Sequence, residues 1–85
     1  MKREEIDKKV LSAIADVLGC DMCNISQQSE LVEDLGADSL DGVEILIQVE
    51  TDLDFEMSTD DYYLYVNQAK TVKDVCDLIE KYVNQ

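Results

Sequence analysis

Apolar side chains recur at intervals of three and four residues in three segments of the chain, the spacing that places them on one face of an α-helix. The first segment runs from about Arg3 to Leu18 and ends at Gly19, a residue that commonly terminates helices. The second runs from Ser39 to about Leu53. The third follows Thr71, whose side chain can cap a helix together with Asp74. The pattern predicts three main helices. The apolar stripe expected on the last one consists of Val72, Val75, Cys76, Ile79, Tyr82 and Val83.

The connection between the first two helices, residues 20–37, is longer than most loops in compact domains. We therefore expect its own apolar side chains to pin it to the core, or a short turn to form within it. The candidates for pinning are Ile25, Leu31, Val32 and Leu35.

A fourth, short helix of one or two turns is expected after residue 57, since Ser58 or Thr59 can cap it and Ser58 pairs with Asp61 as a capping box. Its body, residues 62–66, is rich in β-prone aromatic residues, but cap signals precede it and helices flank it. No repeat, low-complexity tract or linker interrupts the chain. The sequence thus predicts an all-α fold in a single domain, residues 1–85: a small bundle of three main helices plus one short helix, with a long loop between helices 1 and 2.

The start of the central helix carries the clearest chemical signal. Asp38 is a good N-cap, and the Asp41 side chain can reach back to it. Gly36 allows a sharp turn into the helix. Ser39 then stands in the first turn with a free hydroxyl, where unpaired N–H groups and the helix dipole favour an attached anion. The alternative is a first-turn serine with no further role.

The central helix has two apolar faces. At 100° per residue, one face carries Ile45, Leu46, Val49 and Leu53, which is a sufficient core stripe. The opposite face carries Leu40, Val43 and Ile47 among acidic residues. A small bundle cannot easily bury both faces, so the second stripe indicates a docking surface, unless its members are scattered surface apolars.

Charge restricts the partners. The chain has 7 basic and 20 acidic residues, a net charge of −13, and no Lys or Arg between Lys9 and Lys70. This composition argues against nucleic acid and anionic membranes and favours basic partner proteins. We find no signal peptide or membrane-spanning run and an odd number of cysteines, which together suggest a cytoplasmic protein in a reducing compartment and no membrane insertion.

Other chemistries find little support. Without histidine, neither Ser39 nor a cysteine can form a Ser–His or Cys–His pair, so we expect no enzyme. Cys20 and Cys23 form an isolated C-x-x-C, for which a buried Cys20 and a loop thiol at Cys23 are favoured over a zinc or redox site; no metal site is expected. An acidic calcium-binding helical protein is the rival class, but neither register of the EF-hand loop fits, with Ala37 or Met57 at essential positions.

The segment Leu31–Asp41, with sequence LVEDLGADSLD, resembles the attachment motif of acyl carrier proteins, and the similarity extends loosely over the whole chain. The resemblance implies that a phosphopantetheinyl transferase, using coenzyme A and Mg²⁺, attaches 4′-phosphopantetheine to Ser39. The arm would hold acyl groups as thioesters, and the bundle would shelter the apolar chain. Partner enzymes would dock on Asp38, Leu40, Val43, Glu44, Ile47 and Glu50.

The resemblance further implies a monomer that serves basic-surfaced enzymes of acyl-chain metabolism: ketosynthase, reductase, dehydratase and acyltransferase. The chain departs from the family after the central helix. It has Met57-Ser58-Thr59 where many members have Ile-Pro-Asp, contains no proline, and carries Tyr62, Tyr63 and Tyr65 in a longer third-helix region. These departures bear on the pathway and not on the carrier function, and fatty acid synthesis is the first expectation for the pathway. A specialised carrier for a polyketide or another acyl product is the second, and an aminoacyl carrier is less favoured.

Overall fold

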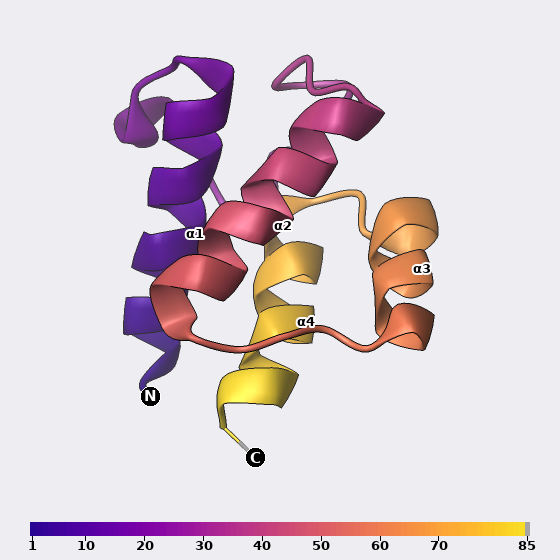
Figure 1. The fold of residues 1–85 in the computed structure, drawn as a ribbon. Coiled ribbons are helices and arrows are strands. Elements are labelled where there is room, and N and C mark those ends of the chain that lie inside the picture. Colours follow the sequence, from indigo (N-terminus) through magenta and orange to yellow (C-terminus); the bar gives the residue numbers. More distant parts are fainter. Residues whose placement is uncertain (85) are drawn as a thin grey trace.

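The computed structural model describes residues 1–84 and contains four α-helices and one short 3₁₀ turn in this range. Their order is α1 (Arg3–Leu18), η1 (Met22–Asn24), α2 (Ser39–Leu53), α3 (Thr59–Gln68) and α4 (Val72–Val83). In Figure 1, α2 crosses beside α1 and α4, while α3 stands at the side of the bundle away from α1. The predicted all-α bundle with a long first loop is confirmed.

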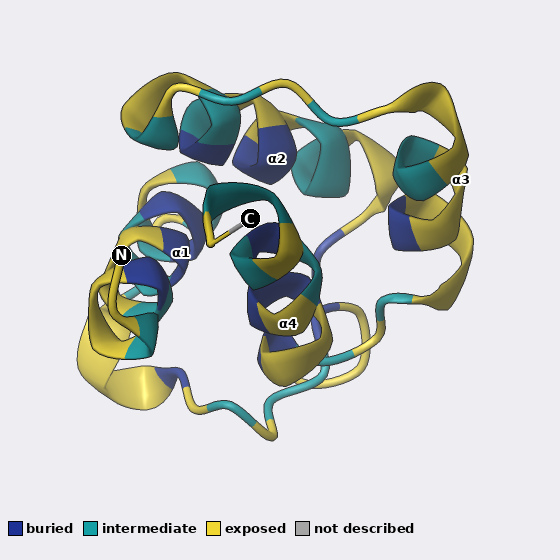
Figure 2. Cartoon of the chain, turned by 90° about the horizontal axis from the view of Figure 1, so that it is seen from below, coloured by how far each residue is buried: buried dark blue, intermediate teal, exposed yellow. Residues whose placement is uncertain are grey.

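The core is formed mainly by α1, α2 and α4. Figure 2 shows their buried residues turned toward the space that the three helices enclose. The side chains with no exposed surface include Ile6, Val10 and Ile14 of α1, Ile45 and Val49 of α2, and Val72, Val75, Cys76 and Ile79 of α4. The predicted stripes are confirmed in their central positions. Leu53, Tyr82 and Val83, near the helix ends, are only partly buried, because fewer elements surround them.

The helix ends follow the predicted cap signals. Gly19 ends α1 with φ of +69°, a conformation that glycine adopts without steric cost. Thr71 and Asp74 form a capping box at the start of α4. Ser58 caps α3, its hydroxyl accepting from the Asp61 N–H at 3.3 Å. The predicted capping box with Asp61 is only half formed, because the Ser58 N–H donates to the Tyr82 hydroxyl instead of to the Asp61 carboxylate. These three boundaries are confirmed.

The long loop is held against the start of α4 by its backbone. The N–H of Leu31 donates to the carbonyl of Lys70 at 2.8 Å, and the N–H of Val72 donates to Ser29 at 3.0 Å. Ile25 and Leu31 are buried and Leu35 is half-buried, as expected, and η1 supplies the short turn. The expectation for Val32 was wrong: 65% of it is exposed, because the turn that buries Leu31 leaves the next side chain outside.

Two further expectations need correction. The third helix has 10 residues, about three turns rather than one or two. Its length is explained by Tyr65, which is buried against α2 and gives the middle of the helix a tertiary contact. Cys20 is half-buried rather than buried, since it lies just past the end of α1. No helix within residues 1–84 combines the length and the apolar content needed to cross a bilayer.

Candidate functional site

The start of α2 is closed by a reciprocal pair of hydrogen bonds. The Asp41 N–H donates to Asp38 Oδ1 at 2.8 Å, and the Asp38 N–H donates to Asp41 Oδ2 at 3.1 Å. Gly36 enters this cap with φ of +71°, and Ala37 is buried while its N–H donates to the Leu31 carbonyl at 2.8 Å. The predicted capping box is therefore present, and it fixes the position of the residue that follows it.

Ser39 is the first residue of α2, and it is exposed. The N–H groups at this end of a helix, those of Ser39 and Leu40, have no partner within the helix, and the helix dipole adds a partial positive charge there. The nearby carboxylates of Asp38 and Asp41 accept hydrogen bonds from backbone N–H groups. An anionic substituent on the Ser39 oxygen would thus project into solvent while its phosphate stays near free amide donors.

A cavity of about 170 Å³ opens beside Ser39, between the end of the long loop, the first turn of α2, and α3. Its walls come from Leu31, Val32, Ala37, Asp38, Ser39, Gly42, Val43, Tyr65, Val66 and Ala69. The lining is mostly apolar and includes the candidate serine. A flexible apolar chain attached at Ser39 would find this cavity within immediate reach.

The segment around Ser39 lies within a region that matches a known family. The family described as "phosphopantetheine attachment site" matches residues 8–79. The chain belongs to this family. It is 40% identical over 79 residues to the acyl carrier protein of Thermotoga maritima, a match that covers 93% of each chain. It is 36% identical over 78 residues to that of Clostridium acetobutylicum, covering 92% of this chain and 96% of the relative.

Family membership identifies the cofactor and the role of the protein. The chain is a phosphopantetheine-bearing acyl carrier, and 4′-phosphopantetheine is its covalent cofactor. Fatty acid synthesis is the usual role of such carriers. The geometry fits the group: an exposed hydroxyl stands on a rigid helix start, with amide donors beside it and an apolar cavity next to it. The loaded arm supplies a terminal thiol for thioester formation.

The expected docking residues differ in their exposure to solvent. Leu40 and Ile47 are 64% and 55% exposed, and Asp38 and Glu44 are exposed as well. Val43 is half-buried and forms part of the cavity wall. Glu50 is half-buried, and its carboxylate accepts a hydrogen bond from the Met57 N–H at 2.8 Å. Val43 and Glu50 therefore make contacts within the protein in addition to any contact with a partner.

Sequence reasoning missed Tyr65 as part of the site. Only 4% of this residue is exposed, and its hydroxyl donates to the backbone carbonyl of Gly42 at 2.7 Å. Burial raises the pKa of the Tyr65 phenol, so the hydroxyl stays protonated and remains a donor. The cluster of tyrosines in a longer third helix was a visible departure from the family, but nothing in the pattern linked it to Gly42.

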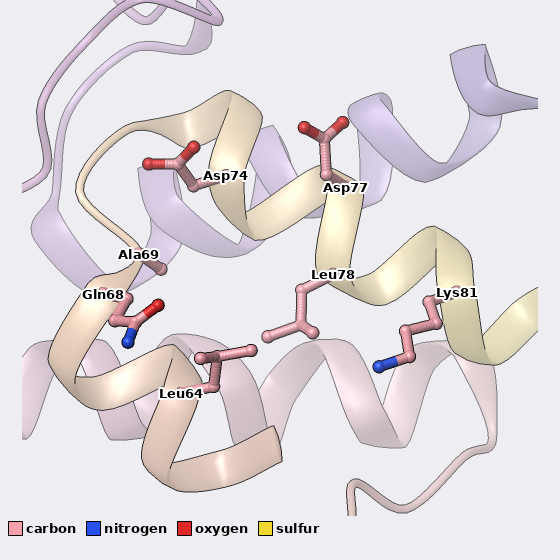
Figure 3. A pocket seen from close by; sticks show the side chains of 7 residues that line it. All are labelled: Leu64, Gln68, Ala69, Asp74, Asp77, Leu78 and Lys81. Carbon is pink, nitrogen blue, oxygen red and sulfur yellow. The ribbon is translucent and has the colours of Figure 1, made fainter.

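A second hollow, between α3 and α4, is larger but lies apart from the serine. It measures about 380 Å³, and Figure 3 shows Leu64 of α3 and Leu78 of α4 meeting across it. Its acidic rim is already engaged: Asp77 pairs with Arg3 and Lys73, each at 2.8 Å, and these cations lower the pKa of the Asp77 carboxyl. No residue of the Ser39 motif lines this hollow.

The three cysteines are free. Cys23 is exposed in η1, which is the loop position that we expected. Cys76 is buried on α4, and burial raises the pKa of its thiol to about 12, so it stays protonated at neutral pH. Within residues 1–84, no three His, Cys, Asp or Glu side chains are grouped so that they could hold a metal ion.

Proposed function

We propose that Ser39 Oγ is the atom that bears the phosphopantetheine arm, and that this carrier presents arm-linked acyl groups to the enzymes of fatty acid synthesis. The observation that carries the proposal is the position of Ser39. It is exposed at the first residue of a capped helix, within residues 8–79 matched by the attachment-site family. The relatives named above carry the name acyl carrier protein.

Attachment requires a partner enzyme. The Ser39 oxygen forms a new bond to the pantetheine-linked phosphorus of coenzyme A, and the pyrophosphate P–O bond of coenzyme A breaks, so that adenosine 3′,5′-bisphosphate leaves. Ser39 loses its proton in this step, and a base must accept that proton. The chain has no histidine, and the neighbouring Asp38 and Asp41 carboxylates bind the N–H groups of the cap. A phosphopantetheinyl transferase therefore supplies the base as well as coenzyme A. On the same grounds, this chain is a substrate and not itself an enzyme.

The exposed face of α2 is the proposed docking surface. Leu40 and Ile47 offer apolar contact, and Asp38 and Glu44 add negative charge around them. No Lys or Arg occurs between Lys9 and Lys70, so the whole surface around Ser39 attracts basic partners. Ketosynthase, reductase, dehydratase and acyltransferase partners with basic surfaces fit this arrangement. Val43 and Glu50 would contribute at the edge.

Residues 1–84 share one hydrophobic core, which supports a single carrier domain over residues 1–85; Gln85 lies outside the described residues. We further propose that the carrier is monomeric and cytoplasmic. Its high negative charge opposes self-association, and three free cysteines suit a reducing compartment.

The proposal is tested by transferring an acylated arm. Incubation with butyryl-coenzyme A, Mg²⁺ and a transferase should add one butyryl-pantetheine arm to each chain. Hydroxylamine should then remove the butyryl group and leave the arm, because thioesters are cleaved under conditions that spare the phosphodiester. A chain that stays unmodified by several transferases would contradict the proposal, as would an acyl group that resists hydroxylamine.

A further inference from the structure

Tyr65 is one of the residues that line the cavity beside Ser39. Ser39 lines it as well, and Gly42 and Val43 are the last residues of α2 that do so. Gly42 lies about 4.5 Å further along the helix axis than Ser39, given a rise of 1.5 Å per residue. At this level of α2 the Tyr65 hydroxyl donates to the Gly42 carbonyl, and the core residues Ile45 and Leu46, which follow in the helix, do not line the cavity.

The cavity is small for a fatty acyl chain. An apolar cavity of about 150 Å³ holds a benzene molecule, so the 170 Å³ found here accommodates on the order of six carbon atoms. A longer chain that enters fully must move Tyr65. This breaks the 2.7 Å hydrogen bond and leaves a buried hydroxyl without its acceptor, which is unfavourable.

We infer that Tyr65 sets the length of acyl chain that this carrier shelters, limiting the chain to about six carbons while the Tyr65–Gly42 hydrogen bond is intact. The inference rests on the proposed attachment of the arm at Ser39. It concerns a residue of this chain's own third helix, in the region where the sequence departs from the family.

The backbone at Gly42 fits this role. A Cβ placed there would lie 3.9 Å from the Tyr65 hydroxyl, an ordinary contact distance. Little free space therefore remains between the Tyr65 hydroxyl and α2 at Gly42. An acyl chain cannot pass between them while the two residues stay in contact. α3 is also fixed at its beginning, where the Tyr82 hydroxyl donates to Asp61 and accepts from the Ser58 N–H at 3.0 Å. Tyr65 is therefore held both by its own hydrogen bond to Gly42 and by the fixed beginning of its helix.

The test loads the carrier with chains of different length. Wild-type protein bearing the bare arm or a butyryl, hexanoyl, octanoyl or decanoyl arm is melted, and the gain in melting temperature over the bare arm is recorded. A sheltered chain stabilises the fold by burying apolar surface. For the wild type, we expect the gain in melting temperature to increase with acyl chain length up to about six carbons and then to stay constant. For Tyr65→Ala, the gain should keep increasing up to at least about eight carbons.

Two further variants complete the test. Tyr65→Leu keeps an apolar core side chain and should also extend the limit, so the inference stays testable if Tyr65→Ala does not fold. Tyr63→Ala is the matched control, because Tyr63 lies on the same helix with 62% of it exposed; its limit should match the wild type. A wild-type gain that still rises at ten carbons would overturn the inference, and so would a limit that stays unchanged in the folded Tyr65 variants. If no arm can be attached at all, the proposed function fails instead, before any chain length is compared.

Discussion

Val49 and Ile47 lie two residues apart in α2 but on different sides of it. Val49 has no exposed surface, whereas Ile47 is 55% exposed. Val49→Ala removes two buried carbon atoms at ~0.8 kcal/mol each, and the cavity left behind raises the expected loss of stability to about 1–3 kcal/mol. In a domain of this size, each 1 kcal/mol lowers the melting temperature by about 4–8 °C, so the variant should melt roughly 4–24 °C below the wild type.

Ile47→Ala should behave differently, because its side chain lies in the proposed docking surface. We expect its free energy of unfolding to stay within about 0.5 kcal/mol of the wild type. Its use by a partner ketosynthase or acyltransferase should nevertheless fall, since the enzyme loses an apolar contact. Glu44→Lys should reduce that use more strongly, by opposing a basic partner surface. Urea unfolding followed by circular dichroism measures stability, and steady-state kinetics with the loaded carrier measures docking.

Glu5→Lys on α1 provides a control with the same change of charge outside the proposed surface, and it should leave the kinetics near the wild type. The reasoning is refuted if Ile47→Ala destabilises the protein as much as Val49→Ala, since Ile47 would then belong to the core. If Ile47→Ala and Glu44→Lys both leave the kinetics unchanged, partners dock elsewhere.

Three further predictions concern stability. Gly42→Ala should raise the free energy of unfolding by about 0.5–1 kcal/mol in urea melts, because alanine favours a helix and its Cβ fits 3.9 Å from the Tyr65 hydroxyl; a loss would show that the glycine is required. Added NaCl should raise the melting temperature, because the Debye length shortens to about 10 Å at 0.1 M and screens repulsion among the acids; Mg²⁺ and Ca²⁺ should act alike, whereas strongly selective, micromolar Ca²⁺ binding would favour a calcium sensor. The Tyr82 hydroxyl lowers the pKa of the Asp61 carboxyl from its ordinary 3.8, so the stability that this ionised group adds should be present above about pH 4 and lost as pH falls through the lowered pKa. The stability difference between wild type and Asp61→Asn should shrink over that acidic range, and a difference independent of pH there would refute the link.

The sequence was sufficient to predict the elements that local chemistry determines. The bounds of α1 and α2, the capping box of Asp38 and Asp41, and the exposed position of Ser39 agree with the structure, because caps, glycine and helical periodicity act within a few residues. Ser39 itself could be selected only because the surrounding motif resembles a family. A first-turn serine alone carries no such meaning.

The contacts between distant segments could not be predicted. The hydrogen bond from Tyr65 to Gly42 joins residues 23 apart, and it depends on where the α2–α3 loop places the third helix. Without that contact, the aromatic run suggested a shorter helix than the one formed. Val32 was misplaced for a similar reason, since periodicity does not show which of two adjacent apolar residues a turn will bury.

The central claim is that Ser39 carries the phosphopantetheine arm. The most direct measurement is the intact mass of the wild type and of Ser39→Ala after incubation with coenzyme A, Mg²⁺ and a transferase, with Ser12→Ala on α1 as the control. We expect the wild type and Ser12→Ala each to gain the mass of one arm and Ser39→Ala to gain nothing, with an unchanged melting curve showing that it is folded. A modified Ser39→Ala protein would contradict the claim.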